Sequence, residues 1–212
     1  HPQWVDTHAH LQFDNYRGSV DAVLKRALEA GVSKVLTVGV NTHDSKQAVE
    51  LASRYESVWA SVGIHPHQAG EAKAGIGFIE ELASRRKVVA IGECGLDYFK
   101  SRASKEDQEQ ALRLQVELAQ KLNLPLIFHV REAFDDFCRI MDDYSGLRGV
   151  VHSFSAGQLE LDRVLKQGWM VALNGITTFT KDASQMEAEK NIRIERLILE
   201  TDAPLLSPAG YR

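Results

Sequence analysis

Short runs of β-branched and other apolar residues recur along the chain, and segments with a helical period separate them. Eight such runs predict strands over Gln3–Asp6, Lys34–Val40, Val58–Ile64, Val88–Gly92, Pro125–Val130, Gly149–Ser153, Trp169–Leu173 and Arg196–Glu200. Because helical segments lie between them, the pattern favours parallel βα units over hairpins.

The clearest helix is predicted to begin at Ser104, where Asp107 three residues later completes a capping box. Apolar residues follow at helical spacing until Pro125, which stops the helix. Further helical patterns cover Val20–Leu28, Ser45–Tyr55, Phe78–Arg86, Phe134–Tyr144, Leu159–Lys166 and Ala183–Lys190.

Eight strands that alternate with helices predict an α/β fold, the (β/α)8 TIM barrel, as a single domain over residues 1–212. The alternative is an open doubly wound sheet, but no glycine-rich phosphate-binding turn follows the first strand. The chain stops at Arg212, soon after the eighth strand, whereas a complete barrel has about 250 residues. We therefore expect the C-terminal closing helix to be lacking and one face of the first and last strands to be uncovered.

Composition narrows the classes of protein that the chain can belong to. The 212 residues are 44% hydrophobic and 25% charged, which excludes disorder, collagen and coiled coil. Because the net charge is −4, a nucleic acid could be held only by a local basic patch or through metal ions. Two cysteines make no disulfide scaffold, and no apolar run approaches the roughly 20 residues that span a bilayer. We expect a cytoplasmic protein with no membrane partner.

Histidines give the strongest chemical signal. Of the eight in the chain, seven lie at or beyond the ends of predicted strands, namely His8, His10, His43, His65, His67, His129 and His152. Glu93 and Asp202 follow the fourth and eighth strands. A single histidine of this kind is more often structural, but strand ends meet at one rim of a barrel, and imidazoles gathered there with carboxylates form a divalent-metal site. The joint pattern predicts such a site.

Six separated motifs then carry a resemblance to a known family. DTHAHL, GIHPH, GECGLDY, FHVRE, VHSFS and ETDAP, in this order and spacing between Trp4 and Pro208, closely resemble the TatD-type metal-dependent deoxyribonucleases of the amidohydrolase superfamily. The resemblance implies a (β/α)8 barrel, two divalent ions and hydrolysis of DNA phosphodiesters. By motif, it implies that one ion is held by His8, His10 and Asp202, that the other is held by His129 and His152, and that Glu93 bridges both.

The chemistry of these residue types supports catalytic roles. Two neighbouring ions can lower the pKa of a shared water and stabilise the attacking and leaving oxygens of a phosphodiester. Asp202 is the best candidate to accept the proton of that water, beside Glu93 as the bridge. His65 could bind the phosphate and assist catalysis, or it could hold the loop before Pro66. Arg131 could grip a phosphate oxygen, or it could pair with a neighbouring acidic residue.

The identity of the metal and the substrate stay open. Four imidazoles favour Zn or Mn over Mg, whereas the family resemblance points to activity with Mg. A site at the mouth of a barrel would accept a strand end more readily than an intact duplex, which favours an exonuclease. Lys100, Arg102 and Lys105 form a basic stretch that is either solvated surface or a guide for a DNA backbone. The alternatives are an amidohydrolase or deacylase that acts on a C–N or ester bond, and a metal-binding protein without turnover.

Overall fold

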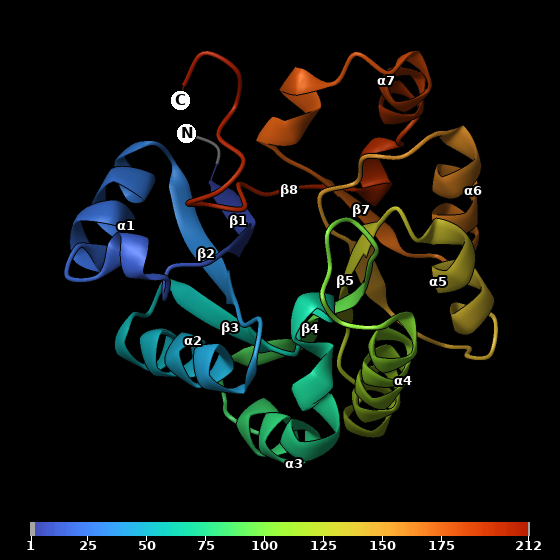
Figure 1. Ribbon diagram of the computed structural model, residues 1–212. Coiled ribbons are helices and arrows are strands. Elements are labelled where there is room, and N and C mark those ends of the chain that lie inside the picture. Colours follow the sequence, from blue (N-terminus) through green and yellow to red (C-terminus); the bar gives the residue numbers. More distant parts are fainter. Residues whose placement is uncertain (1–2, 212) are drawn as a thin grey trace.

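The computed structural model describes residues 3–211, and its centre is a parallel sheet of eight strands in the order β1 to β8 (Figure 1). The strands are β1 Trp4–Ala9, β2 Val32–Val38, β3 Val58–Val62, β4 Val88–Asp97, β5 Leu126–Arg131, β6 Gly149–Val151, β7 Met170–Leu173 and β8 Leu197–Leu199. Each strand pairs in parallel with the next one along the chain. The predicted (β/α)8 barrel is therefore confirmed.

Helices surround these strands as an outer ring (Figure 1). They are α1 Val20–Glu29, α2 Thr42–Arg54, α3 Ala72–Ala83, α4 Lys105–Leu122, α5 Phe134–Met141, α6 Gln158–Lys166 and α7 Ala183–Lys190. Short 3₁₀ turns lie at η1 Asp14–Tyr16, η2 Pro66–Glu71, η3 Gly175–Phe179 and η4 Ile194–Arg196. Among residues 3–211, no helix is both long and apolar enough to cross a membrane.

Helix α4 begins where the sequence predicts. The Ser104 side chain accepts a hydrogen bond from the backbone N–H of Asp107 at 3.0 Å, which satisfies one of the free donors of the first turn. At the other end Asn123 adopts a left-handed conformation with φ of 52° and terminates the helix. Its inner face buries Leu112 and Val116 in the main core between sheet and helices.

Two strands are longer than predicted. β1 continues to Ala9, and β4 continues through Gly92 and Gly95 to Asp97. At Gly95 a Cβ atom would lie 1.9 Å from the carbonyl oxygen of His129, so this glycine permits a close approach of β5. The prediction that β4 ends at Gly92 is therefore wrong, and Glu93 lies within the strand.

The first and last strands meet in a seam that is closed at its carboxyl end. The Asp202 N–H donates to the carbonyl of His8 at 2.7 Å, and the His10 N–H donates to that of Ala203 at 2.8 Å. In these two strands, Trp4 and Leu199 are 50% and 47% exposed.

Unusual backbone conformations gather at the carboxyl rim of the barrel. Five non-glycine residues beyond the ends of β4, β5, β6 and β8 have a positive φ, namely Lys100, Glu132, Ser153, Asp202 and Leu206. Such conformations cost roughly 1–3 kcal/mol each, and they persist where surrounding contacts fix them, often at functional sites. The carboxyl rim of the barrel therefore has the backbone conformations that are common at functional sites.

Candidate metal centre

The seam between β8 and β1 brings the first predicted ligand set together. His8 lies in β1, His10 follows that strand, and Asp202 stands on the loop after β8. From Asp202 Oδ1, the Nε2 atom of His10 lies 3.1 Å away and that of His8 lies 3.5 Å away. These three buried side chains therefore converge on a region small enough for one ion.

The surroundings of these imidazoles fit a cation. His10 Nδ1 lies 2.8 Å from the carbonyl oxygen of Val38, which can only accept, so Nδ1 carries the proton and the neutral ring has its lone pair on Nε2. That lone pair faces Asp202, an arrangement that needs a proton or a metal ion between the two acceptors. His8 is fully buried, and neither of its ring nitrogens has a hydrogen-bond partner. Unpaired buried polar atoms are costly. A bound ion would lower this cost, because it would give a partner to the Nε2 atom of His10 and to a ring nitrogen of His8.

Glu93 lies at the centre of the cluster and is only 3% exposed. Its carboxylate is 2.7 Å from His129 Nδ1, 3.3 Å from His152 Nε2 and 3.3 Å from His8 Nε2. Burial raises the pKa of this carboxyl, but the charge of His152 and hydrogen bonds from the imidazoles outweigh it, so the pKa lies well below its usual value. Glu93 is thus an ionised carboxylate that reaches both histidine groups, as the predicted bridge requires.

The second histidine pair approaches Glu93 from β5 and from the end of β6. The rings of His152 and His8 stack with centroids 3.8 Å apart. Each member of the pair also contacts a second carboxylate, since His129 Nε2 is 2.8 Å from Asp97 Oδ2 and His152 Nδ1 is 2.9 Å from Glu200 Oε1. A carboxylate behind a ligating imidazole fixes its tautomer and ring orientation. The geometry thus points the other nitrogen of each ring at Glu93.

Glu200 is the functional candidate that the sequence did not single out. Its Oε1 atom also accepts hydrogen bonds from the Ser153 N–H and the Asn174 side-chain amide, both at 2.8 Å. The available signal was its spacing, because Glu200 lies two residues before Asp202 and alternate residues of an extended chain share a side. Asp97, the last residue of β4, is likewise buried and lies against His129.

His65 lies beside the cluster but is a poor metal ligand. Its Nδ1 accepts a hydrogen bond from the backbone N–H of His67 at 3.0 Å, so Nε2 carries the proton. Nε2 lies 3.7 Å from Glu93 Oε1, on the side of the metal centre. Burial lowers the pKa of His65 to about 3, which makes it a neutral hydrogen-bond donor. His65, Asp97 and His129 also lie close enough to hold an ion, but this tautomer argues against it.

The remaining candidates lie around the site. His67 Nε2 is 3.2 Å from Asp97 Oδ2, whereas the exposed His43 lies on α2, outside the cluster. Arg131, at the end of β5, has its guanidinium 3.8 Å from the ring centroid of Phe99. Within residues 3–211 it makes no ion pair with an acidic side chain at 4.0 Å or less, so the alternative of a structural pair has no support.

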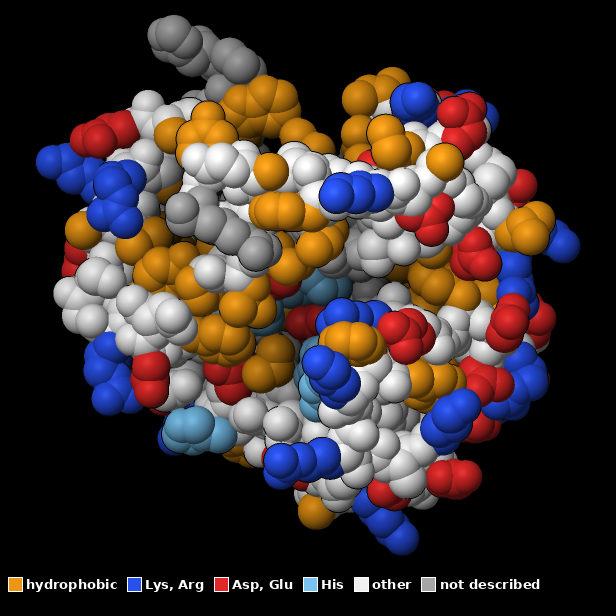
Figure 2. All heavy atoms as spheres, turned by 45° about the horizontal axis from the view of Figure 1, so that its top comes forward, with side chains coloured by type: hydrophobic (Ala, Val, Ile, Leu, Met, Phe, Trp, Pro, Cys, Tyr) orange, Lys and Arg blue, Asp and Glu red, His pale blue; other side chains and the backbone are white. Residues whose placement is uncertain are grey.

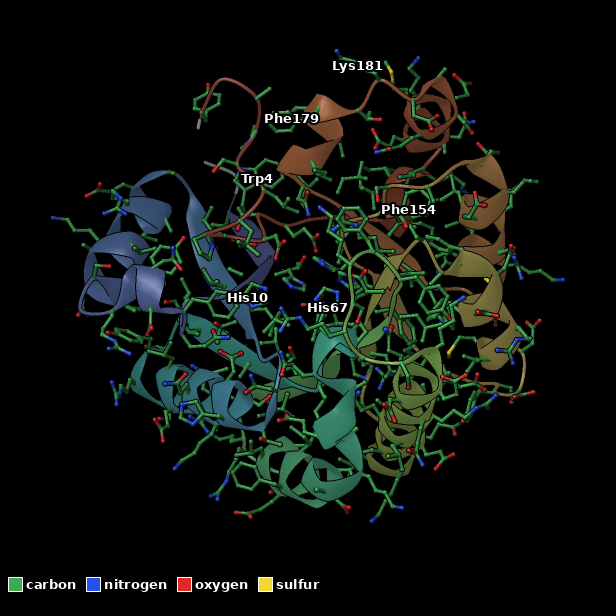
Figure 3. All side chains as sticks on the ribbon, in the orientation of Figure 1. Trp4, His10, His67, Phe154, Phe179 and Lys181 are labelled. Carbon is green, nitrogen blue, oxygen red and sulfur yellow. The ribbon has the colours of Figure 1, made fainter. Side chains whose placement is uncertain are left out.

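The site opens to solvent at one end of the barrel. Figure 2 shows a hollow with histidine and acidic side chains at its floor and Lys and Arg side chains beside it. Figure 3 shows His10 and His67 on opposite sides of the centre of the barrel. The cationic side chains beside this hollow suit an anionic substrate.

Comparison with known proteins gives the chain a family. The TatD related DNase family matches residues 5–212. A protein of Bacillus subtilis named "Uncharacterized metal-dependent hydrolase YabD" is 33% identical over 210 residues, which cover 98% of this chain and 82% of the relative. The "3'-5' ssDNA/RNA exonuclease TatD" of Pantoea ananatis is 35% identical over 212 residues, with the same two coverages of 98% and 82%.

A solved structure agrees with this family. The TatD homologue YJJV of Escherichia coli superposes with a TM-score of 0.92 and 29% identity, and the match covers 99% of this chain and 82% of that one. These comparisons confirm the predicted barrel and the assignment of the chain as a metal-dependent hydrolase of the nuclease type. With its six motifs in order and its rim of histidines and carboxylates, the chain belongs to the TatD related DNase family.

Proposed function

We propose that the chain is a 3′–5′ exonuclease that hydrolyses phosphodiester bonds of single-stranded DNA with the help of two divalent ions. The observation that carries the proposal is the position of Glu93, an ionised buried carboxylate within 3.3 Å of three imidazoles from β1, β5 and the end of β6. The names of the relatives support the substrate and the polarity.

The distances between potential ligand atoms indicate which residues would hold each ion. His8, His10 and Asp202 would hold one ion, His129 and His152 the other, and Glu93 both. When bound, such ions supply Lewis-acid stabilisation of the phosphate and activate water near neutral pH. The imidazole-rich set favours tight binding of Zn²⁺ or Mn²⁺, and the family resemblance supports turnover with Mg²⁺ or Mn²⁺.

The protein's own side chains then account for proton transfer and substrate binding. The Asp202 carboxylate accepts the proton of the attacking water. Burial raises the pKa of this carboxyl, but the contact with His10 and the charges of the nearby His152 and His8 together outweigh burial and lower the pKa, so the carboxylate is ionised and can accept a proton. The Nε2–H of His65 donates to a phosphate oxygen, and the imidazole is neutral at neutral pH because burial lowers its pKa to about 3. The exposed Arg131 guanidinium provides a second, charged contact to the phosphate.

The test is a panel of substrates. Protein stripped of metal by a chelator is offered a single-stranded DNA oligonucleotide, a small aryl phosphodiester and an acyl amide, with Mg²⁺, Mn²⁺ or Zn²⁺ added back. We expect the oligonucleotide to be shortened from its 3′ end only when metal is present. Hydrolysis of the amide alone would favour a deacylase instead. A protein that binds metal but cleaves none of the three would be a binding protein without turnover.

A further inference from the structure

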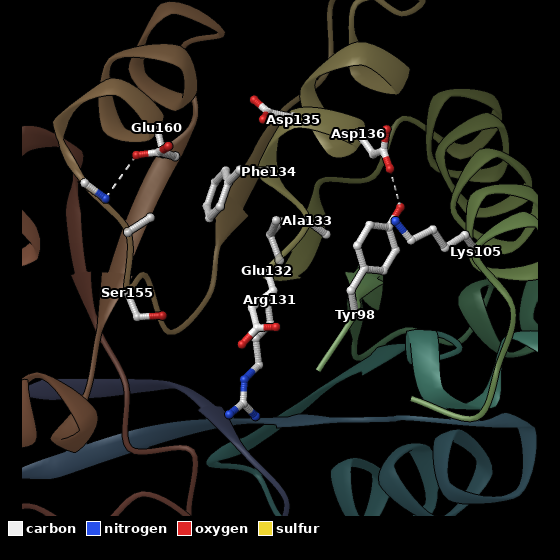
Figure 4. A pocket seen from close by; sticks show the side chains of 13 residues that line it. Tyr98, Lys105, Arg131, Glu132, Ala133, Phe134, Asp135, Asp136, Ser155 and Glu160 are labelled. Carbon is white, nitrogen blue, oxygen red and sulfur yellow. Dashed lines mark hydrogen bonds between the residues drawn. The ribbon is translucent and has the colours of Figure 1, made fainter. Parts of the chain in front are cut away.

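A cavity with a volume of about 660 Å³ adjoins the metal centre on the side of β4, β5 and β6 (Figure 4). Its lining begins one to three residues beyond Asp97, His129 and His152, with Tyr98, Val130 and Ser155. None of the proposed metal ligands lines the cavity, so the metal site does not account for it. A group bound in this cavity would lie next to whatever reacts at the ions.

Two aromatic side chains stand on opposite sides of the cavity (Figure 4). The hydroxyl of Tyr98 donates to Asp136 Oδ2 at 2.7 Å, and Lys105 Nζ lies 4.1 Å from the ring centroid, so this ring is fixed and partly covered. Phe134, the first residue of α5, is half-buried, and its ring meets that of Phe154 edge to face with centroids 6.0 Å apart. Phe134 is thus a fixed aromatic surface at the cavity.

Acidic side chains outnumber cationic ones around the cavity, which disfavours a phosphate inside it. Four carboxylates line it, those of Glu132, Asp135, Asp136 and Glu160, against the two cations Lys105 and Arg131. In Figure 4 the guanidinium of Arg131 points away from Asp135 and Asp136. This guanidinium lies 3.8 Å from the ring centroid of Phe99, and the ammonium group of Lys100 lies 4.9 Å from the same centroid. Arg131 and Lys100 thus share the ring of Phe99, whereas Lys105 lies over the ring of Tyr98, whose hydroxyl is bonded to Asp136. The aromatic and small side chains of the lining suit an uncharged planar group.

We infer that this cavity binds the nucleobase of one of the two nucleosides joined by the phosphodiester that is cleaved. The inference rests on the proposed function. The base stacks against Phe134, and the backbone of the strand passes along Lys100, Lys105 and Arg131. Single-strand binding proteins combine aromatic surfaces for bases and a cationic path for the backbone in the same way. Because a base in a duplex is stacked on both faces, entry into the cavity requires an unpaired strand end.

The experiment first removes single bases from the substrate and then replaces Phe134, the proposed stacking surface. Single-stranded oligonucleotides carry one abasic residue at the terminal, penultimate or a remote position, and hydrolysis is followed with Mn²⁺ present. For the wild-type enzyme we expect an abasic residue at one of the two end positions to raise KM by about 5- to 150-fold, the range of base–aromatic stacking. The remote abasic residue should have no effect.

Side-chain variants then assign the effect to the cavity. Phe134→Ala should raise KM for the intact oligonucleotide by a similar factor, and the abasic residue should add no further loss. Phe134→Leu keeps the apolar volume and serves if the alanine variant does not fold. Phe78→Ala on α3 is the matched control, because Phe78 is 38% exposed and does not line the cavity. In Phe78→Ala, the abasic residue should raise KM by the same factor as in the wild type.

Two outcomes would overturn the inference alone. They are hydrolysis without any position-dependent abasic penalty, and a penalty that is equally large in the wild type and in the folded Phe134 variants. A protein that shortens no oligonucleotide under any metal condition would instead overturn the proposed function, and the base site with it.

Discussion

Glu200 offers a sharp test of how the metal centre is built, because it touches the proposed ligands without being one. Its Oε1 accepts three hydrogen bonds at 2.8–2.9 Å, from His152, Ser153 and Asn174. Its Oε2 lies 3.9 Å from His8 Nδ1. Replacing it by Gln keeps an oxygen of similar position but removes the negative charge that holds the Nδ1 proton of His152 and orients the ring.

The size of the effect follows from this arrangement. Loss of a carboxylate behind a ligating histidine weakens metal binding about 10- to 100-fold, which corresponds to roughly 1.4–2.8 kcal/mol. Glu200→Ala should do more, because it leaves three donors without an acceptor, two of them buried, at about 1–3 kcal/mol for each buried donor. We therefore expect Glu200→Gln to fold and bind metal weakly, and Glu200→Ala to be strongly destabilised.

The assay is a calorimetric titration of chelator-treated protein with Zn²⁺ or Co²⁺, together with the Co²⁺ absorption spectrum, which reports ligand geometry. Glu187→Gln is the matched control, since this glutamate lies on α7 with a side chain that is 65% exposed. Metal affinity and Co²⁺ spectrum should be unchanged in the control. A Glu200→Gln protein that binds both ions as tightly as the wild type would refute the orienting role.

Three further predictions concern the reaction and the fold. Glu93→Gln should lower bound metal and activity together, whereas Asp202→Asn should keep much of the metal and lose about 100-fold in rate, as elemental analysis and DNA hydrolysis would measure. His65→Phe should raise KM for DNA by roughly 10-fold with little change in metal content, because a donor to a charged oxygen is lost. Gly95→Ala should fail to fold by circular dichroism, since its Cβ would lie 1.9 Å from the His129 carbonyl oxygen.

Each of these has an outcome that contradicts it. Asp202→Asn with both ions bound and a near-full rate would exclude Asp202 as the proton acceptor. An unchanged KM in His65→Phe would leave His65 as a residue that only holds its loop. For the fold, Gly77→Ala on α3 is the control, because nothing lies within 4 Å of the added Cβ; equal stability of the two alanine variants would show that β5 can move away from Gly95.

The sequence predicts the barrel and the gathering of its ligands because both depend on local patterns. Alternating apolar runs and helical periods locate all eight strands, and strand ends of a barrel necessarily meet at one rim. His8 and Asp202 are separated by most of the chain, yet they converge because β1 and β8 are neighbours. The motifs of the family then indicate which of these residues belong together.

What the sequence could not predict depends on contacts between strands. Gly95 looks like a strand breaker, and only the close approach of the His129 backbone explains why β4 continues past it. Glu200 resembles an ordinary polar strand end until His152 and Asn174 are seen to donate to it. The cavity beside Phe134 is likewise formed by three loops whose relative position no local pattern specifies.

Anomalous diffraction from a crystal grown with Mn²⁺ would show directly whether two ions lie on either side of Glu93. We expect two anomalous peaks, one among His8, His10 and Asp202 and one beside His129 and His152, with the Glu93 carboxylate touching both. A single peak, or a peak held by His65 and Asp97 with none at His8, would contradict it.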